Sequence, residues 1–271
     1  MASKNALLFF LFIGLLLMFN AGLVQAGTLV SFFLYETILL VTLLLLISER
    51  RRFSWGAPGG LVLGLATGAV LMTFLFTTFL ASGWLRVEGL ATPEVPMVLG
   101  MAILFQGMVA SGEELAFRGY MLSHLREAGS DRFAVAATAL LFASIHLPAI
   151  AAGGVPPANA AVMFLTLTAG GALLGLMALR WGLLAAIGLH FAWNLLQYHI
   201  FSMARVLPHS SLLGLSYGGG PDLLTGGLCA GGPCGPEAGL LGLVAFAVPA
   251  FLLLRSSPAR PAAPPAGGAG A

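Results

Sequence analysis

The chain has 271 residues, of which 59% are hydrophobic and only 8% are charged. Soluble domains carry about a quarter charged residues, so this composition excludes an ordinary water-soluble protein and indicates a polytopic membrane protein. The net charge of +2 and the lack of a basic stripe in the sequence argue against nucleic acid as a partner.

Eight apolar segments follow one another along the chain, each close to the ~20 residues that a helix needs to cross a bilayer. They predict an all-α, polytopic transmembrane helix bundle with spans at about 6–26, 29–48, 59–83, 95–114, 132–150, 159–179, 183–203 and 239–254. The fourth segment is expected to continue as a helix to about Glu127. We therefore expect one transmembrane domain over residues 1–255, followed by a disordered Pro/Ala/Gly-rich tail at 256–271.

The first segment, 6–26, has two interpretations. A retained helix is favoured, but Lys4, the apolar stretch and the small residues near Ala26 also resemble a secretory signal with a cleavage site. Orientation follows from the basic residues in short loops. Eight spans place Arg86 and Arg205 on one side, and a larger basic set on the other. That larger set is Lys4, Arg50, Arg51, Arg52, Arg126, Arg132, Arg180, Arg255 and Arg260. This asymmetry predicts a multi-pass protein of the bacterial cytoplasmic membrane with both termini in the cytoplasm.

The two cysteines, Cys229 and Cys234, lie close together in a Gly/Pro-rich loop predicted to face outward, at about 204–238. A disulfide is possible if that loop faces an oxidising compartment. Two free or loosely paired thiols are the other interpretation. The spacing is a weak metal signal, since no histidine or further cysteine lies nearby.

Two adjacent acids, Glu113 and Glu114, stand inside apolar sequence at membrane depth. A carboxylate there is costly and therefore indicates a functional site. Glu114 and Arg118 are four residues apart with the acid first, which is the favourable order for an ion pair on a helix. Glu113 is rotated about 100° from Glu114. We expect Glu114 and Arg118 to support the site structurally, and Glu113 to face a cavity.

Glu113 and a histidine in the next segment are predicted to lie at the same depth in the membrane. Glu113 precedes Glu127 by 14 residues, and His146 follows Arg132 by 14 residues, around a turn at 129–131. At 1.5 Å per residue, each lies roughly 21 Å from the turn. Antiparallel neighbours should therefore carry Glu113 and His146 at one level.

A second polar pair lies on the segment at 183–203. His190 and Asn194 are four residues apart and share one helix face. If the hairpins pack together, this pair approaches Glu113 and His146. A carboxylate beside an imidazole in a partly dry cavity can polarise water as a general base. His190 and Asn194 could then donate hydrogen bonds to the oxyanion of an acyl substrate.

Three motifs, in this order, carry a resemblance to a known family: Glu113-Glu114-Leu-Ala-Phe-Arg118, Phe142-Ala-Ser-Ile-His146 and His190-Phe-Ala-Trp-Asn194. They resemble the Glu-Glu-x-x-x-Arg, Phe-x-x-x-His and His-x-x-x-Asn motifs of the CAAX prenyl protease and bacteriocin-processing (CPBP or Abi) family of intramembrane proteases. The resemblance covers about 95–200, and Gly235-Pro-Glu237 is also similar to the family.

The resemblance implies a glutamate-dependent endopeptidase that acts on a membrane-associated or prenylated protein or peptide and needs no cofactor. It implies that Glu113 activates water with His146, that His190 and Asn194 stabilise the oxyanion, and that Glu114 and Arg118 support the site.

Two alternatives remain open. The first is a zinc-dependent intramembrane metalloprotease with Glu113, His146 and His190 as ligands, although the sequence lacks a His-Glu-x-x-His motif. The second is a non-enzymatic membrane protein, either a scaffold, a bacteriocin self-immunity factor or a transporter. A transporter is expected to show broken helices or repeated halves, and the sequence indicates neither.

Overall fold

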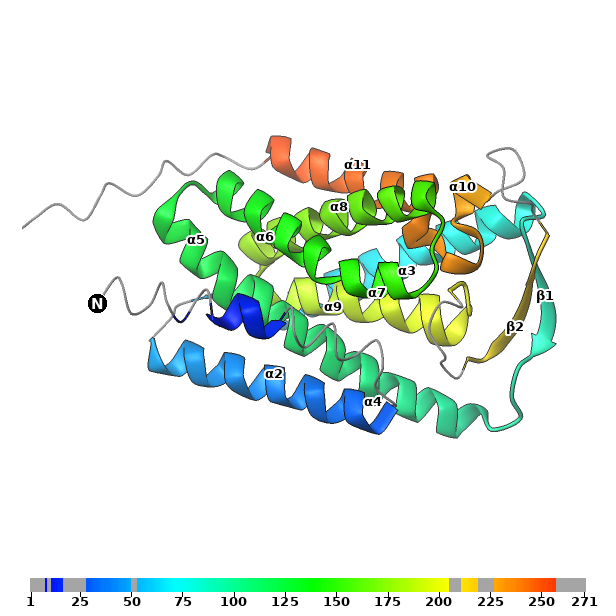
Figure 1. Cartoon of the computed structure of the whole chain (residues 1–271), viewed down its shortest axis with the longest axis horizontal. Coiled ribbons are helices and arrows are strands. Elements are labelled where there is room, and N and C mark those ends of the chain that lie inside the picture. Colours follow the sequence, from blue (N-terminus) through cyan, green and yellow to red (C-terminus); the bar gives the residue numbers. More distant parts are fainter. Residues whose placement is uncertain are drawn as a thin grey trace, which may run out of the picture.

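A computed structural model describes residues 8, 11–16, 28–49, 53–204, 211–218 and 227–256, which form a helical bundle with one small β-ribbon (Figure 1). The helices are α2 (Thr28–Ser48), α3 (Pro58–Ala81), α4 (Val95–Glu114), α5 (Leu122–Ala128), α6 (Asp131–Ile145), α7 (Leu147–Ala152), α8 (Pro157–Trp181), α9 (Leu183–Asn194), α10 (Gly227–Ala230) and α11 (Leu240–Ser256). Two π-helical segments, η1 (Leu115–Met121) and η2 (Leu195–Ile200), continue α4 and α9. The predicted all-helical fold class is confirmed.

The predicted number of spans is not confirmed. Four helices in the described part of the chain are long and apolar enough to cross a membrane: Pro58–Ala81, Val95–Ala128, Asp131–Ala152 and Pro157–Trp181. Shorter apolar helices cover Glu36–Ser48 and Leu240–Ser256. Most of the predicted first segment, 6–26, and the tail after Ser256 lie outside the described residues.

The predicted turn at 129–131 is present, and a second turn joins the predicted segments at 159–179 and 183–203. Between α5 and α6, the Ser130 hydroxyl accepts a hydrogen bond from the Phe133 amide and so caps α6. Arg126 reaches across the same turn to Asp131 at 2.8 Å. Between α8 and α9, Gly182 has φ +91°, and a Cβ there would meet the Gly56 Cα at 2.3 Å, so only glycine fits. The helix through α4, η1 and α5 ends at Ala128, close to the predicted Glu127.

Close packing of α3 on α9 fixes the position of the helix that carries His190. Gly60, Gly64 and Gly68 recur every four residues and form one face of α3. A Cβ at Gly64 would lie 2.1 Å from the Ala185 carbonyl oxygen, and one at Gly68 would lie 2.7 Å from that of Leu189. Small residues at this spacing let the backbones of two membrane helices approach closely.

The bundle also carries a two-stranded antiparallel ribbon that the sequence reasoning did not predict. Strand β1 (Leu85–Leu90) pairs with β2 (Leu213–Tyr217), and Leu85 and Leu215 are its buried side chains. The Leu212 amide just before β2 donates to the His199 carbonyl of η2 at 2.7 Å. The ribbon therefore lies at the end of the bundle where η2 ends, opposite the α5–α6 turn (Figure 1).

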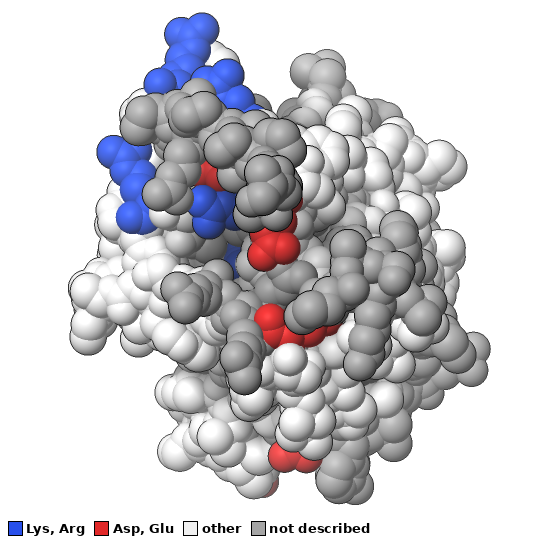
Figure 2. Space-filling model, turned by 90° about the vertical axis from the view of Figure 1, so that its left-hand side faces the viewer, with Lys and Arg blue, Asp and Glu red and all other residues white. Residues whose placement is uncertain are grey.

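Basic side chains gather at the other end of the bundle. The helix ends that carry Arg126, Arg180 and Arg255 and the helix start that carries Arg132 all lie there (Figure 1). Figure 2 looks onto this end and shows the lysine and arginine side chains gathered toward one side of it. Arg86 lies in the ribbon at the opposite end.

The loop before α11 is built from α10 and two 3₁₀ turns, η4 (Gly232–Cys234) and η5 (Pro236–Ala238). Cys229 and Cys234 are both free thiols here and are not joined in a disulfide. Burial raises the pKa of the Cys234 thiol above its ordinary value.

Candidate active site

The glutamate pair lies at the end of α4, where the α-helix continues into the π-helix η1. The predicted ion pair is present: Arg118 Nη1 donates to Glu114 Oε1 at 2.9 Å, with both side chains fully buried. Arg118 Nη2 also donates to the Gly171 carbonyl of α8 at 3.0 Å. Its guanidinium lies 4.7 Å from the centre of the Phe142 ring. Arg118 therefore joins α4, α6 and α8 around Glu114.

His190 approaches both glutamates from α9. Its Nδ1 donates to Glu114 Oε1 at 2.8 Å, and its Nε2 lies 3.9 Å from Glu113 Oε2. Because the Glu114 carboxylate accepts from Nδ1, the imidazole is held in one orientation, with Nε2 directed towards Glu113. The sequence reasoning did not anticipate this role of Glu114 as a partner of His190.

His146 lies at a break between α6 and α7 and not inside a continuous helix. Pro148 has no amide hydrogen, so the helical bond to the Ser144 carbonyl cannot form, and α6 ends at Ile145. His146 Nδ1 donates to the Phe142 carbonyl at 2.7 Å. A donor at Nδ1 leaves Nε2 of the neutral ring as a hydrogen-bond acceptor. The sequence, which indicated no broken helix, did not predict this interruption.

Phe142 is the shared neighbour of the two histidines. Its ring centre lies 4.8 Å from that of His146 and 6.1 Å from that of His190. The structure thus brings Glu113, Glu114, Arg118 and His190 into one contact group and places His146 against the same aromatic ring. The predicted match in depth between Glu113 and His146 stays a prediction.

Asn194 is the last residue of α9 and lies on the same helix face as His190, as predicted. Its side chain is half-buried and forms no hydrogen bond with the described part of the chain. The next residue, Leu195, begins η2. Thus α4 changes to π-helix directly after Glu114, and α9 does so directly after Asn194. Such changes are frequently found at functional sites, and helix periodicity alone did not reveal them.

Further buried polar groups lie near the motif residues, and the sequence reasoning assigned no role to them. On α4, two turns before Glu113, Gln106 bonds His199 of η2 at 2.9 Å through its Nε2 atom. Glu237 of η5 accepts from Trp193 of α9. Their signal in the sequence was weak, because isolated polar residues between apolar segments also occur in loops.

No group of three or more His, Cys, Asp or Glu side chains within the described ranges is arranged to hold a metal ion. One nitrogen of His146 and one of His190 already bond the Phe142 carbonyl and Glu114. Each imidazole could therefore offer only Nε2 to a metal. A zinc-ligating histidine uses one ring nitrogen, so zinc ligation by Glu113, His146 and His190 stays an alternative.

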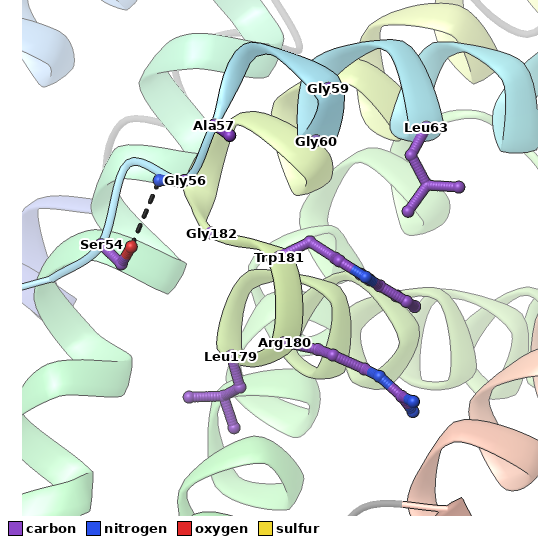
Figure 3. A pocket seen from close by; sticks show the side chains of 10 residues that line it. All are labelled: Ser54, Gly56, Ala57, Gly59, Gly60, Leu63, Leu179, Arg180, Trp181 and Gly182. Atoms are coloured by element: carbon purple, nitrogen blue, oxygen red, sulfur yellow. Dashed lines mark hydrogen bonds between the residues drawn. The ribbon is translucent and has the colours of Figure 1, made fainter.

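An open cavity of about 380 Å³ lies away from these residues, between the start of α3 and the α8–α9 turn. Figure 3 shows Trp181 and Arg180 on one side of it and Leu63 on the other. None of the predicted site residues lines this cavity, which lies at the end of the bundle where the basic residues gather.

The comparison with protein families agrees with the geometry. Residues 92–196 match the family described as "Type II CAAX prenyl endopeptidase Rce1-like", whose members are peptidases. The matched segment contains all three motifs, from Glu113 to Asn194. A search of curated proteins found no match. Residues 92–196 are thus similar to the Rce1-like family, consistent with the CPBP family, and the apolar helices indicate an integral membrane protein.

Proposed function

We propose that the protein is an intramembrane endopeptidase that hydrolyses a peptide bond of a membrane-associated or lipidated protein or peptide with a water activated by Glu113. The observation that supports this most strongly is the contact group of Glu113, Glu114 and His190. A buried carboxylate lies 3.9 Å from an imidazole nitrogen whose orientation a second carboxylate fixes. A purely structural ion pair would not require one carboxylate to orient the imidazole towards another carboxylate.

Water activation needs a base and an ordered water. The 3.9 Å between Glu113 Oε2 and His190 Nε2 is too long for a direct hydrogen bond, and one water would bond both atoms in the proposed mechanism. Glu113 would take a proton from this water as its oxygen attacks the scissile carbonyl carbon. His146, whose Nδ1 donates to the Phe142 carbonyl, would accept a hydrogen bond at Nε2 and assist.

The tetrahedral intermediate carries a negative oxygen that needs donors. With its Nδ1 proton held by Glu114, a doubly protonated His190 would donate from Nε2. The half-buried amide of Asn194, one turn further along α9, would be the second donor. The C–N bond then breaks, and the proton held by Glu113 passes to the leaving amine. No covalent enzyme intermediate is needed.

The distribution of charge supports an orientation in the membrane. Arginine is favoured on the cytoplasmic side, so the end that carries Arg126, Arg132, Arg180 and Arg255 would face the cytoplasm of a bacterial cell. The ribbon and the loop before α11 would then face outward. Both termini would be cytoplasmic.

The test uses two complementary measurements on the full-length protein in membranes. The first is cleavage of a farnesylated CAAX peptide by wild type, Glu113→Gln, His146→Ala and the control Glu94→Gln, whose side chain is exposed at the start of α4. The second is a comparison of membrane peptides from cells that express wild type or Glu113→Ala. We expect the control to retain full cleavage and the site variants to lose about 100-fold or more.

Each outcome is informative. A peptide pool that disappears with Glu113→Ala would define the substrate class even if the farnesylated peptide is not cleaved. Wild-type processing by both Glu113→Gln and His146→Ala would refute the peptidase assignment. An immunity or complementation phenotype that survives Glu113→Ala would instead favour a scaffold.

A further inference from the structure

Glu237 is a buried carboxylate that the mechanism above does not use. It lies in η5, just before α11, and is 7% exposed. Glu237 Oε1 accepts a hydrogen bond from Trp193 Nε1 at 2.9 Å, and Oε2 accepts one from the Tyr198 hydroxyl at 3.3 Å. Both oxygens of one side chain therefore bond the segment that carries His190 and Asn194.

The two partners lie on either side of the change in helix type. Trp193 is in α9, directly before Asn194, and Tyr198 is in η2. The backbone changes between these residues from α-helical to π-helical bonding, which is rare and appears mostly as short segments within α-helices. A side chain that bonds residues before and after this point fixes how far the helix is wound there. It thereby fixes the direction in which the Asn194 side chain projects from the helix.

Glu237 is itself held firmly, so it can act as a fixed point. The Asn159 amide of α8 donates to the carbonyls of Gly227 at 3.1 Å and Ala238 at 2.9 Å, which anchors the loop on α8. On α11, Gly242 packs so closely that a Cβ there would lie 1.9 Å from the Pro236 carbonyl oxygen. The η5 turn is thus attached to two helices that do not carry the motif residues.

The ring of Trp193 is held on a second side as well. It packs against Phe246 of α11, with 4.1 Å between ring centres. The Glu237 carboxylate and the Phe246 ring together determine the orientation of the indole. Trp193 lies three residues after His190, about one turn along α9. The fixed indole therefore also restrains the backbone between His190 and Asn194, the two proposed oxyanion donors.

The chemistry of the contact indicates why a carboxylate stands here. Within the part of the chain that the structure describes, Glu237 forms no ion pair, and its two partners are neutral donors. A buried charge without a cation is costly, so a simple loop anchor would be expected to use a neutral group. A carboxylate offers two acceptor oxygens for two donors, whereas an amide offers one.

We infer that Glu237 is a positioning residue for the candidate active site: from outside the three motifs, it sets the α-to-π junction of α9 and η2 and so holds Asn194 in place for the oxyanion. This inference rests on the proposed peptidase function. It also makes the loop before α11 part of the active-site framework.

The test compares Glu237→Ala with Asn159→Ala in the full-length protein. Both variants loosen the same loop, but only Glu237→Ala removes contacts with α9 and η2. On a farnesylated CAAX peptide, we expect Glu237→Ala to lower kcat by about 10- to 100-fold with KM changed less than about 3-fold. Glu237→Gln, which keeps the acceptor for Trp193, should recover part of the loss. Asn159→Ala loosens the loop but keeps both Glu237 bonds, so its kcat should fall by less than about 3-fold in the folded fraction.

A second readout does not depend on cleavage. Hydrogen exchange of the backbone amides at 194–200 should become about 10-fold faster in Glu237→Ala and change by less than about 3-fold in Asn159→Ala. If Glu237→Ala is poorly folded, Tyr198→Phe and Glu237→Gln each remove one bond and serve in its place. Equal kcat loss, or equal exchange at 194–200, in the Glu237 and Asn159 variants would overturn the inference.

The two proposals fail in different ways. Full cleavage by Glu113→Gln would refute the peptidase mechanism. An inactive Glu113→Gln together with wild-type kcat in Glu237→Ala would leave that mechanism standing and refute the role of Glu237.

Discussion

Replacing Glu114 by glutamine tests whether this residue is the structural centre of the site. The Glu114 side chain is fully buried, and its Oε1 accepts from Arg118 at 2.9 Å and from His190 at 2.8 Å. Glutamine keeps the shape and removes the charge. Hydrogen bonds to charged groups are each worth about 1.5–3 kcal/mol, and a buried charge left without its partner costs about 3–5 kcal/mol. Because Arg118 stays buried, we expect Glu114→Gln to lower the free energy of unfolding by about 3–5 kcal/mol.

The assay is unfolding of the purified protein in mixed micelles with increasing SDS, followed by far-ultraviolet circular dichroism. The adjacent Glu113→Gln is the matched control, because its contact with His190 is longer, 3.9 Å, and the Arg118 pair stays intact. This control should lose less stability than Glu114→Gln while it loses cleavage. An equal loss of stability in the two variants would refute the assignment of Glu114 as the structural acid.

Four further outcomes are expected. Gly64→Ala places a Cβ 2.1 Å from the Ala185 carbonyl and should reduce cleavage by about 100-fold through displacement of α9, whereas Gly59→Ala, with nothing within 4 Å, should be neutral in the same assay. Asn159→Ala should lower the free energy of unfolding in SDS by about 1–3 kcal/mol. Cleavage should persist after removal of metal by a chelator. Loss of cleavage that Zn²⁺ alone restores would instead favour the zinc alternative. The raised pKa of Cys234 lowers its thiolate fraction, so its maleimide labelling at neutral pH should be slower than that of a free thiol, with the difference narrowing as pH rises.

The sequence predicted the features that depend on local spacing. The ion pair of Glu114 with Arg118 follows from an i, i+4 relation, and the turn at 129–131 follows from polar residues between two apolar stretches. Placing His190 and Asn194 on one face required only the period of a helix. The sequence alone does not establish the packing of α9 next to α4, which brings His190 to the glutamates.

The features that the sequence did not predict depend on contacts between distant segments. The bond from His190 to Glu114 requires the rotation of α9 about its axis, which the glycine face of α3 sets. The period of the apolar residues does not reveal the π-helical segments. The ribbon pairs strands on either side of the motif helices, and β1, with the sequence Leu85-Arg-Val-Glu-Gly-Leu90, has only short alternation. The interruption at His146 had a local signal, Pro148, but the apolar run around it suggested a continuous span.

The close pairing of α3 with α9 has a consequence for how the chain is made. The ribosome completes α3 well before α9, with α4 to α8 synthesised between them, so the backbone exposed along Gly60, Gly64 and Gly68 must first face lipid or a temporary neighbour in the translocation machinery. Lipid tails cannot fill that groove as closely as Ala185 and Leu189 do. The late arrival of α9 therefore makes docking of its imidazole one of the last steps of assembly, so the proposed active site would be complete only once most of the spans are in the bilayer.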